Sequence, residues 1–145
     1  MYGPHITKLC IKTKEYYLVD EQLILKIKYA LINSWSKDTC MIFDEDYPYY
    51  GQCAQTTIII FERFGGEILK TKGWPKNEGN GRHFYNRING VRYDFTAEQF
   101  TDIPDYTYNL EYQDIISSVD EAATEADSKQ IMALRYAFNQ AFMKT

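Results

Sequence analysis

Hydrophobic and polar residues follow two different periods along this chain. The stretch DEQLILKIKYALINSW, from residue 20, repeats apolar positions at helical spacing and begins with acidic residues that complement a helix dipole. A second run, CAQTTIIIFERF, carries an apolar stripe and ends at Gly65 and Gly66, and glycine readily ends a helix. Both runs predict helices. For the second, the β-branched residues leave a buried strand as the alternative.

The next segments change to the shorter period of strands. EILKT, residues 67–71, predicts a strand, and the polar residues 72–82 predict a loop. RHFYNRI and VRYDFT flank Asn89 and Gly90, a pair typical of the two-residue type I′ turn of a β-hairpin. This hairpin is the clearest local signal in the chain.

The two ends of the chain are less regular. Residues 1–17 alternate only in places, which allows an edge strand or an extended arm. An irregular stretch rich in Tyr and Asp runs to about residue 119, and residues 122–144 predict a closing helix, strongest from Ile131. No repeat or linker divides the sequence. We therefore expect one α+β domain over residues 1–145, with a small antiparallel sheet and flanking N- and C-terminal helices.

Composition excludes several classes of function. The hydrophobic fraction is 45%, which indicates an ordered globular protein, and the net charge of −4 argues against binding nucleic acid. The longest strongly apolar run, residues 56–61, is far shorter than the roughly 20 residues that span a bilayer. No signal-peptide pattern begins the chain. We expect a cytoplasmic protein that does not bind membranes.

The three cysteines, Cys10, Cys40 and Cys53, lack the spacing of a zinc site or a disulfide framework, so we expect no metal and no cofactor. Cys53 differs from the other two because it opens a predicted helix. Unpaired N–H groups and the dipole at a helix start stabilise a thiolate and an oxyanion. The alternative is that Cys53 is a small buried residue.

The hairpin register provides a partner for this thiol. If Ile88 pairs with Val91, Tyr85 lies opposite Asp94, and His83 and Asp94 share one face as diagonal neighbours. A base held by a carboxylate is the arrangement that activates a nucleophile. The alternative is that this face is the solvated side of an amphipathic hairpin.

Three blocks carry a family resemblance: ALINSWSKDTC, PYYGQCAQTTIIIFERFGGEIL and HFYNRINGVRYDFTAEQF. Over about residues 21–100 the chain resembles the YunG-like family, which is similar in turn to transglutaminase-like and papain-like cysteine enzymes. The resemblance implies a papain-like core in which a central helix carrying Cys53 packs on the sheet. It also implies Cys53 as nucleophile, His83 as general base and Asp94 as the orienting acid.

Other residues in these blocks are candidates for the oxyanion site or the cleft. Gln52 could donate to an oxyanion, or its side chain could point away from the thiol. Trp35 and Asp38 could line the cleft, or serve as a core aromatic and a turn residue. Tyr50, with Tyr49, could form the wall of an acyl pocket. Cys10 and Cys40 are expected to be structural and His5 to be inert.

Three functions remain open from the sequence. The first is a cysteine hydrolase or acyltransferase acting on an amide, ester or thioester of a small molecule or a protein side chain. The second is a binding protein that keeps the fold without catalysis. The third, a metal site built from Cys53, His83 and Asp94, is weaker because three scattered ligands are few.

Overall fold

The computed structural model describes residues 8–11, 14–17, 19–74, 81–102 and 110–144. The described helices are α1 (Glu21–Ile32), α2 (Cys53–Phe64), η1 (Ala97–Phe100), α3 (Val119–Ala122), η2 (Ala123–Glu125) and α4 (Ser128–Lys144). The described strands are β1 (Lys8–Ile11), β2 (Lys14–Tyr17), β3 (Glu67–Trp74), β4 (Gly81–Ile88), β5 (Val91–Tyr93) and β6 (Ile115–Ile116). The protein is therefore a mixed α+β fold, as expected.

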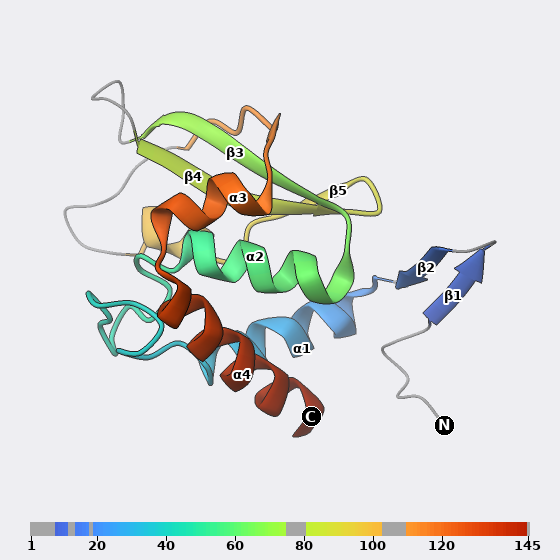
Figure 1. The fold of residues 1–145 in the computed structure, drawn as a ribbon, viewed down its shortest axis with the longest axis horizontal. Coiled ribbons are helices and arrows are strands. Elements are labelled where there is room, and N and C mark those ends of the chain that lie inside the picture. The colour runs from blue at the N-terminus through green and yellow to red at the C-terminus, as the bar shows by residue number, and fades with distance from the viewer. Residues whose placement is uncertain (1–7, 12–13, 18, 75–80, 103–109, 145) are drawn as a thin grey trace.

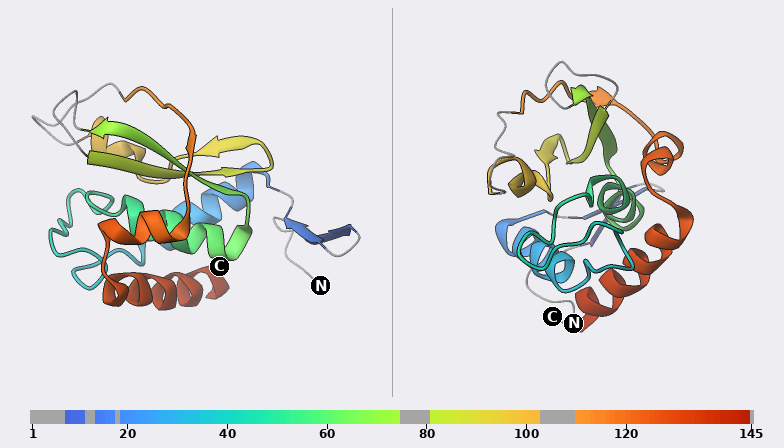
Figure 2. Two further views of the ribbon diagram at one scale, coloured as in Figure 1. Left: turned by 45° about the horizontal axis from the view of Figure 1, so that its top comes forward. Right: turned by 90° about the vertical axis from the view of Figure 1, so that its left-hand side faces the viewer.

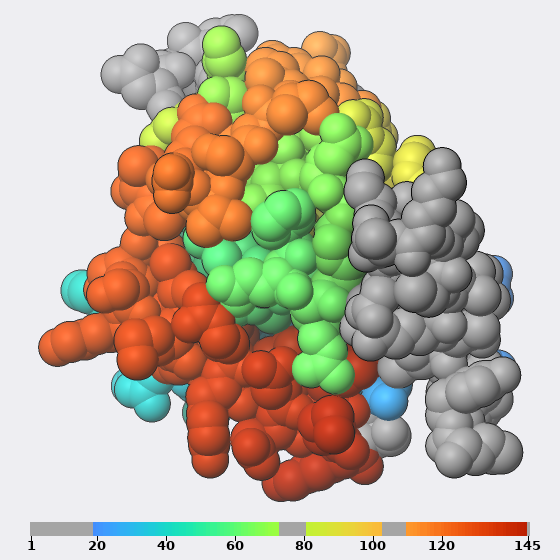
Figure 3. All heavy atoms as spheres, turned by 45° about the vertical axis from the view of Figure 1, so that its right-hand side comes forward, coloured from blue at the N-terminus to red at the C-terminus, as the bar shows by residue number. Residues whose placement is uncertain are grey.

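These elements form three layers around α2 (Figure 1). The sheet lies on one side of α2, and α1 and α4 pack together on the other side (Figure 2). The chain from residue 110 onward passes from the edge of the sheet to α4 and borders the residues of α2 and β3 (Figure 3). The helix that begins at Cys53 is thus central, with one helix before it and one after the sheet, as predicted.

The main sheet has the strand order β5-β4-β3-β6, and each neighbouring pair is antiparallel. Ile88 pairs with Val91 and Asn86 with Tyr93, so the predicted hairpin register is confirmed as far as Tyr93; β5 ends there, and the predicted pair of Tyr85 with Asp94 does not form. Asn89 and Gly90 have φ of 51° and 80°, and positive φ at both central residues defines the type I′ turn.

The run from Cys53 forms a helix, which excludes the buried-strand alternative. Eight of its residues are buried, so it has neighbours on most sides. It ends at Gly65, and the following Gly66 has φ of 81°. A Cβ atom at Gly66 would lie 2.1 Å from the Arg87 carbonyl oxygen. Only glycine therefore allows the chain to turn so closely past β4.

The core lies between the sheet and the helices. Phe84 and Ile88 of β4 point toward α2, and Phe64, at the end of α2, meets Phe138 of α4 edge to face at 6.5 Å. The apolar residues of α1 close the opposite side. None of the described helices is both long enough and apolar enough to cross a bilayer.

The C-terminal segment differs from the single helix predicted for residues 122–144. A helix does span residues 128–144, but the prediction is wrong for residues 122–127, because Ala126 is extended, with φ of −147°, and separates η2 from α4. Asp127 then caps α4: its carboxylate accepts from the Gln130 N–H at 2.8 Å, and its own N–H donates to the Gln130 side chain. Strand β6, which pairs with β3, is a further element that the sequence does not predict.

The N-terminal residues that the structure describes form neither alternative expected for residues 1–17. β1 and β2 pair with each other in a two-stranded sheet of their own, which lies beside α1 in Figure 1. Residues 1–7 and 12–13, part of the same prediction, lie outside the described residues.

Candidate functional site

Cys53 is the first residue of α2 and is partly exposed. Gly51, two residues earlier, has φ of 75°, and a Cβ atom there would lie 2.8 Å from the Cys40 Sγ. Glycine at this turn therefore lets the loop pack tightly where it leads into the helix. In the first helical turn, backbone N–H groups lack acceptors within the helix, so the end of α2 that carries Cys53 has a partial positive charge.

His83 and Asp94 form a buried pair. His83 Nε2 lies 2.7 Å from Asp94 Oδ2, and the side chains are 2% and 5% exposed. A carboxylate can only accept, so Nε2 carries the proton and Nδ1 is left for another partner. The other carboxylate oxygen, Oδ1, accepts from the backbone N–H of Thr96 at 3.2 Å and from its hydroxyl at 3.4 Å. Asp94 is thus fixed through both oxygens.

The Cys53 side chain lies close enough to His83 to influence its pKa. Burial lowers the pKa of His83, but the charge and hydrogen bond of Asp94 and a hydrogen bond and charge from Cys53 outweigh it and raise the pKa to about 10. The structure therefore brings the three residues predicted from the hairpin and the helix start into one contiguous set, with His83 in the middle.

The end of the β4–β5 pairing explains how these residues meet. Pairing stops at Asn86 and Tyr93, so the chain leaves the sheet at Asp94 and enters η1. The Phe100 ring, at the end of η1, covers His83 edge to face at 4.7 Å, and Tyr85 stacks on the imidazole at 5.7 Å. These rings shield the imidazole from water, which strengthens its electrostatic contact with Asp94.

Gln52, the residue before Cys53, is completely buried. Its Oε1 accepts from the Thr39 hydroxyl at 3.0 Å and from Gln55 Nε2 at 3.2 Å. Gln55 Nε2 also donates to the Thr39 carbonyl at 2.7 Å, so it is a donor and fixes the orientation of the Gln52 amide. Among the described residues, Gln52 Nε2 has no hydrogen-bond partner. Gln52 therefore keeps an unused donor in a buried position.

The other cleft candidates lie in different environments. Trp35 is in the core, where its Nε1 donates to the Thr56 hydroxyl of α2 at 3.0 Å, so it supports the helix. Asp38 is exposed in a turn, and its N–H donates to the Ser36 hydroxyl. Tyr50 is half-buried in the loop before Gly51. The structure thus gives Trp35 and Asp38 the core and turn positions that were the alternatives to a cleft role.

Tyr112 is a member of this site that the sequence analysis missed. Its hydroxyl donates to Asp94 Oδ2 at 2.7 Å, the same oxygen that accepts from His83. It lies in an irregular stretch, and Tyr occurs 13 times in the chain, so no pattern distinguishes this residue from the others.

Cys40 lies in a different environment from Cys53. It is buried, and burial, chiefly, together with the charge of Cys53, raises the pKa of the Cys40 thiol. In the part of the chain that the structure describes, no group of three or more His, Cys, Asp or Glu residues is arranged to hold a metal ion. The side chains of Cys10 and His5 lie outside the described residues.

Comparison with known proteins places the chain in a family. It matches the YunG protein family over residues 23–143, most of its length. The chain belongs to the YunG family. It is also 42% identical over 117 residues to the uncharacterized protein YunG of Bacillus subtilis (strain 168), which covers 79% of this chain and 90% of that protein. No solved structure matches this YunG-family chain.

Proposed function

We propose that this protein is a cysteine-dependent hydrolase or acyltransferase that acts on an amide, ester or thioester through Cys53, His83 and Asp94. The observation that carries the proposal is the position of His83, whose Nε2 lies 2.7 Å from Asp94 Oδ2 and which also interacts with the Cys53 side chain. A helix-start cysteine beside a small antiparallel sheet is also the core arrangement of papain-like and transglutaminase-like enzymes, and on this basis we propose that the fold is related to theirs.

In the proposed mechanism, the raised pKa of His83 keeps its ring protonated at neutral pH, so the proton of the Cys53 thiol already resides on the imidazole and Asp94 stabilises the resulting thiolate–imidazolium pair. The thiolate attacks the carbonyl carbon and forms a tetrahedral oxyanion. As this collapses, His83 gives its proton to the leaving amine, alcohol or thiol, and a thioester remains on Cys53. Water or an acceptor amine then attacks the thioester, loses its proton to His83, and releases the acyl group from the sulfur.

The oxyanion would be held by the N–H groups of the first turn of α2. Gln52 is the second candidate donor, because it directly precedes Cys53 in the chain and its buried amide Nε2 has no acceptor among the described residues. Nε2 is covered by other atoms, so a substrate oxygen would reach it only after those side chains move. We expect the helix N–H groups to bind the oxyanion first. Gln52 would add its hydrogen bond when the side chains around the site close on a substrate.

One observation favours a second function, a binding protein without catalysis. His83 and Asp94 are almost fully shielded from solvent, as they would be if they only stabilised the fold. The partial exposure of Cys53 favours the enzyme, since a substrate needs to reach only the sulfur. The reactivity of Cys53 therefore separates the two functions.

The test is labelling with electrophilic acyl probes, with the modified cysteine identified by mass spectrometry. We expect Cys53 to be acylated, Cys53→Ala to lose the label, and His83→Ala to react about 100-fold more slowly because the base is missing. Cys40→Ala is the matched control, since it removes a thiol but leaves Cys53 and His83 in place.

Iodoacetamide gives a second measure of the same thiol. Near neutral pH, Cys53 should react much faster than Cys10 and Cys40, and this advantage should be lost in His83→Ala. Equal rates at the three cysteines, or no effect of His83→Ala on folded protein, would show that the thiol is not activated and would leave the binding function.

A further inference from the structure

Residues 112–114 cross the face of the sheet on which His83 and Tyr85 lie. The Gln113 N–H donates to the Thr71 hydroxyl at 2.9 Å, and its side chain pairs with the backbone of Lys72. The Asp114 N–H donates to the Tyr85 hydroxyl at 2.8 Å. We call residues 112–114 the strap, because they connect β3 and β4 on that face.

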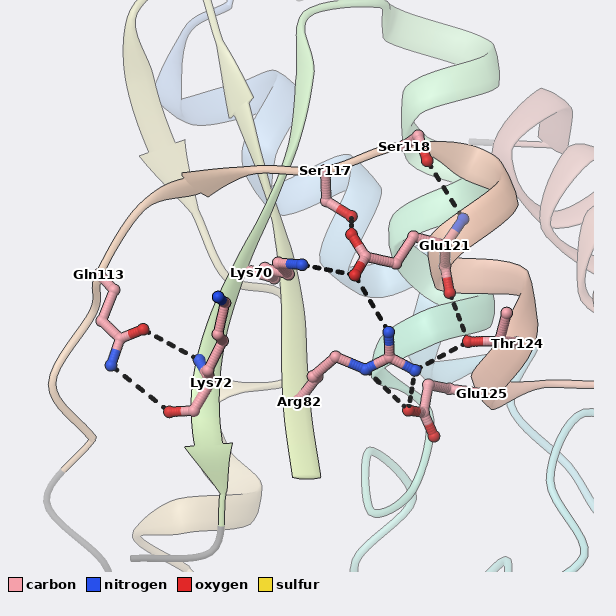
Figure 4. A network of polar contacts seen from close by, with 9 residues as sticks. All are labelled: Lys70, Lys72, Arg82, Gln113, Ser117, Ser118, Glu121, Thr124 and Glu125. Carbon is pink, nitrogen blue, oxygen red and sulfur yellow. Dashed lines mark hydrogen bonds and ion pairs between the residues drawn. The ribbon is translucent and has the colours of Figure 1, made fainter. Parts of the chain in front are cut away.

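The C-terminal end of the strap is held firmly. Asp114 has φ of 53°, an uncommon conformation for a residue other than glycine, and the Arg92 guanidinium holds its carboxylate with two hydrogen bonds. After the strap, β6 pairs with β3, and Ser117 donates to the Glu121 carboxylate, which also accepts from Lys70 and Arg82 (Figure 4). The position of Tyr112 is therefore fixed by the sheet.

The Tyr112 side chain is held as tightly as its backbone. The Arg92 guanidinium lies 4.4 Å from the centre of its ring, and the Tyr85 ring meets it edge to face at 4.9 Å. Burial and the nearby charge of Asp94 raise the pKa of Tyr112, so its hydroxyl stays protonated. Because a carboxylate oxygen can only accept, the protonated hydroxyl is the donor in the bond to Asp94 Oδ2, which lies 2.7 Å away.

We propose that Tyr112 is a positioning residue for the proposed reaction: it holds the Asp94 carboxylate so that Oδ2 stays on Nε2 of His83. The proposal rests on the proposed function, since it assigns to His83 the role of base. Without the Tyr112 hydroxyl, Oδ2 keeps a single donor, and the carboxylate can rotate about its bond toward Thr96. His83 would then lose a fixed partner and Cys53 its oriented base.

The test compares Tyr112→Phe with Tyr136→Phe. Tyr136 lies on α4 and is 70% exposed, so its variant loses a hydroxyl far from the site. A hydrogen bond to a charged group contributes enough to predict an about tenfold slower acylation of Cys53 in Tyr112→Phe. The pH profile of this reaction should also shift. Tyr136→Phe should match the unmodified protein in both measurements.

Nuclear magnetic resonance gives a readout that does not depend on Cys53 chemistry. The chain has two histidines, so ¹⁵N-histidine labelling gives two sets of ring signals, and His83→Gln assigns them. In Tyr112→Phe we expect the Nε2–H signal of His83 to move and its titration midpoint to change. A lower melting temperature with unchanged His83 signals and an unchanged pH profile would overturn the proposal, because it would indicate a purely structural role.

The outcomes also separate this inference from the proposed function. If His83→Ala leaves the acylation of Cys53 unchanged, the proposed function fails, and with it the positioning role in catalysis. If His83→Ala slows the reaction and Tyr112→Phe does not, only the assignment of Tyr112 fails.

Discussion

The two faces of the sheet are built in opposite ways. On the face toward α2, Phe84 and Ile88 pack in the apolar core. On the other face, His83, Tyr85 and Thr71 are also buried, but each of them makes polar contacts with other side chains or with the strap. Both faces are buried, but the α2 face is mainly apolar and the His83 face carries most of the polar contacts.

This difference indicates a division of roles. Apolar burial contributes to the free energy of unfolding in proportion to area and specifies position only loosely. A buried polar group must find its partner, because leaving it unpaired costs more than the hydrogen bond contributes. We therefore expect the α2 face to provide most of the stability and the His83 face to fix the geometry of the site.

Phe84→Ala is the change with the largest expected effect on this comparison. It removes a fully buried ring between the sheet and α2, so the free energy of unfolding should fall by about 3–5 kcal/mol. Denaturant unfolding measures the loss, and Phe84→Leu is the control, with a much smaller loss expected. The protein that stays folded should keep the reactivity of Cys53. A loss of reactivity larger than the loss of folded protein would contradict the division between the faces.

The pH dependence of stability tests the polar face. The pKa of His83 is raised from about 6.5 in the unfolded chain to about 10 in the folded protein. The stabilisation from this shift is therefore complete below pH 6.5 and is lost as the pH rises through 10. We expect the free energy of unfolding to decrease across this range, which denaturant titrations at several pH values would measure.

Asp94→Asn is the matched variant for this measurement. Without the carboxylate, burial would dominate and keep His83 neutral, so the variant should not lose stability between pH 6.5 and 10. Instead it should lose stability as the pH falls below 6.5, when the buried imidazole must take up a proton. Identical pH profiles for the two proteins would show that Asp94 does not control His83.

Asn86→Ala should have the smallest effect. Asn86 is a polar residue on the α2 face, where its amide donates to the Thr57 carbonyl at 3.1 Å. Its loss should cost about 1–2 kcal/mol in denaturant unfolding. Asn33→Ala removes the same kind of bond, to the Tyr29 carbonyl at 2.8 Å, from an exposed position, and should cost less. An equal cost at both sites would mean that burial does not strengthen such bonds here.

The parts of the fold that follow a period were predictable from the sequence. The Asn89–Gly90 turn defined the hairpin register, and the two glycines at 65 and 66 marked the end of α2. The helix break at Ala126 was not predictable, because alanine favours helices and only the capping exchange between Asp127 and Gln130 reveals a new start. β6 was missed because two residues are too few to show a period.

The candidate site also has a part that the sequence predicts and a part that it does not. Cys53, His83 and Asp94 could be grouped from one helix start and one hairpin register, both of which are local in sequence. Tyr112 reaches Asp94 through the strap, and that contact depends on how Asp114 and Arg92 meet in three dimensions. Such a contact has no signature in a single sequence.

Because the strap follows the other site residues in the chain, the site is completed late during synthesis. Residues up to Phe100 already include Cys53, His83 and Asp94, yet Tyr112 and β6 leave the ribosome later. A nascent chain that ends before the strap would hold the thiol next to an imidazole whose carboxylate partner still lacks one of its donors. The site would then be completed only once the chain that closes over the sheet has emerged.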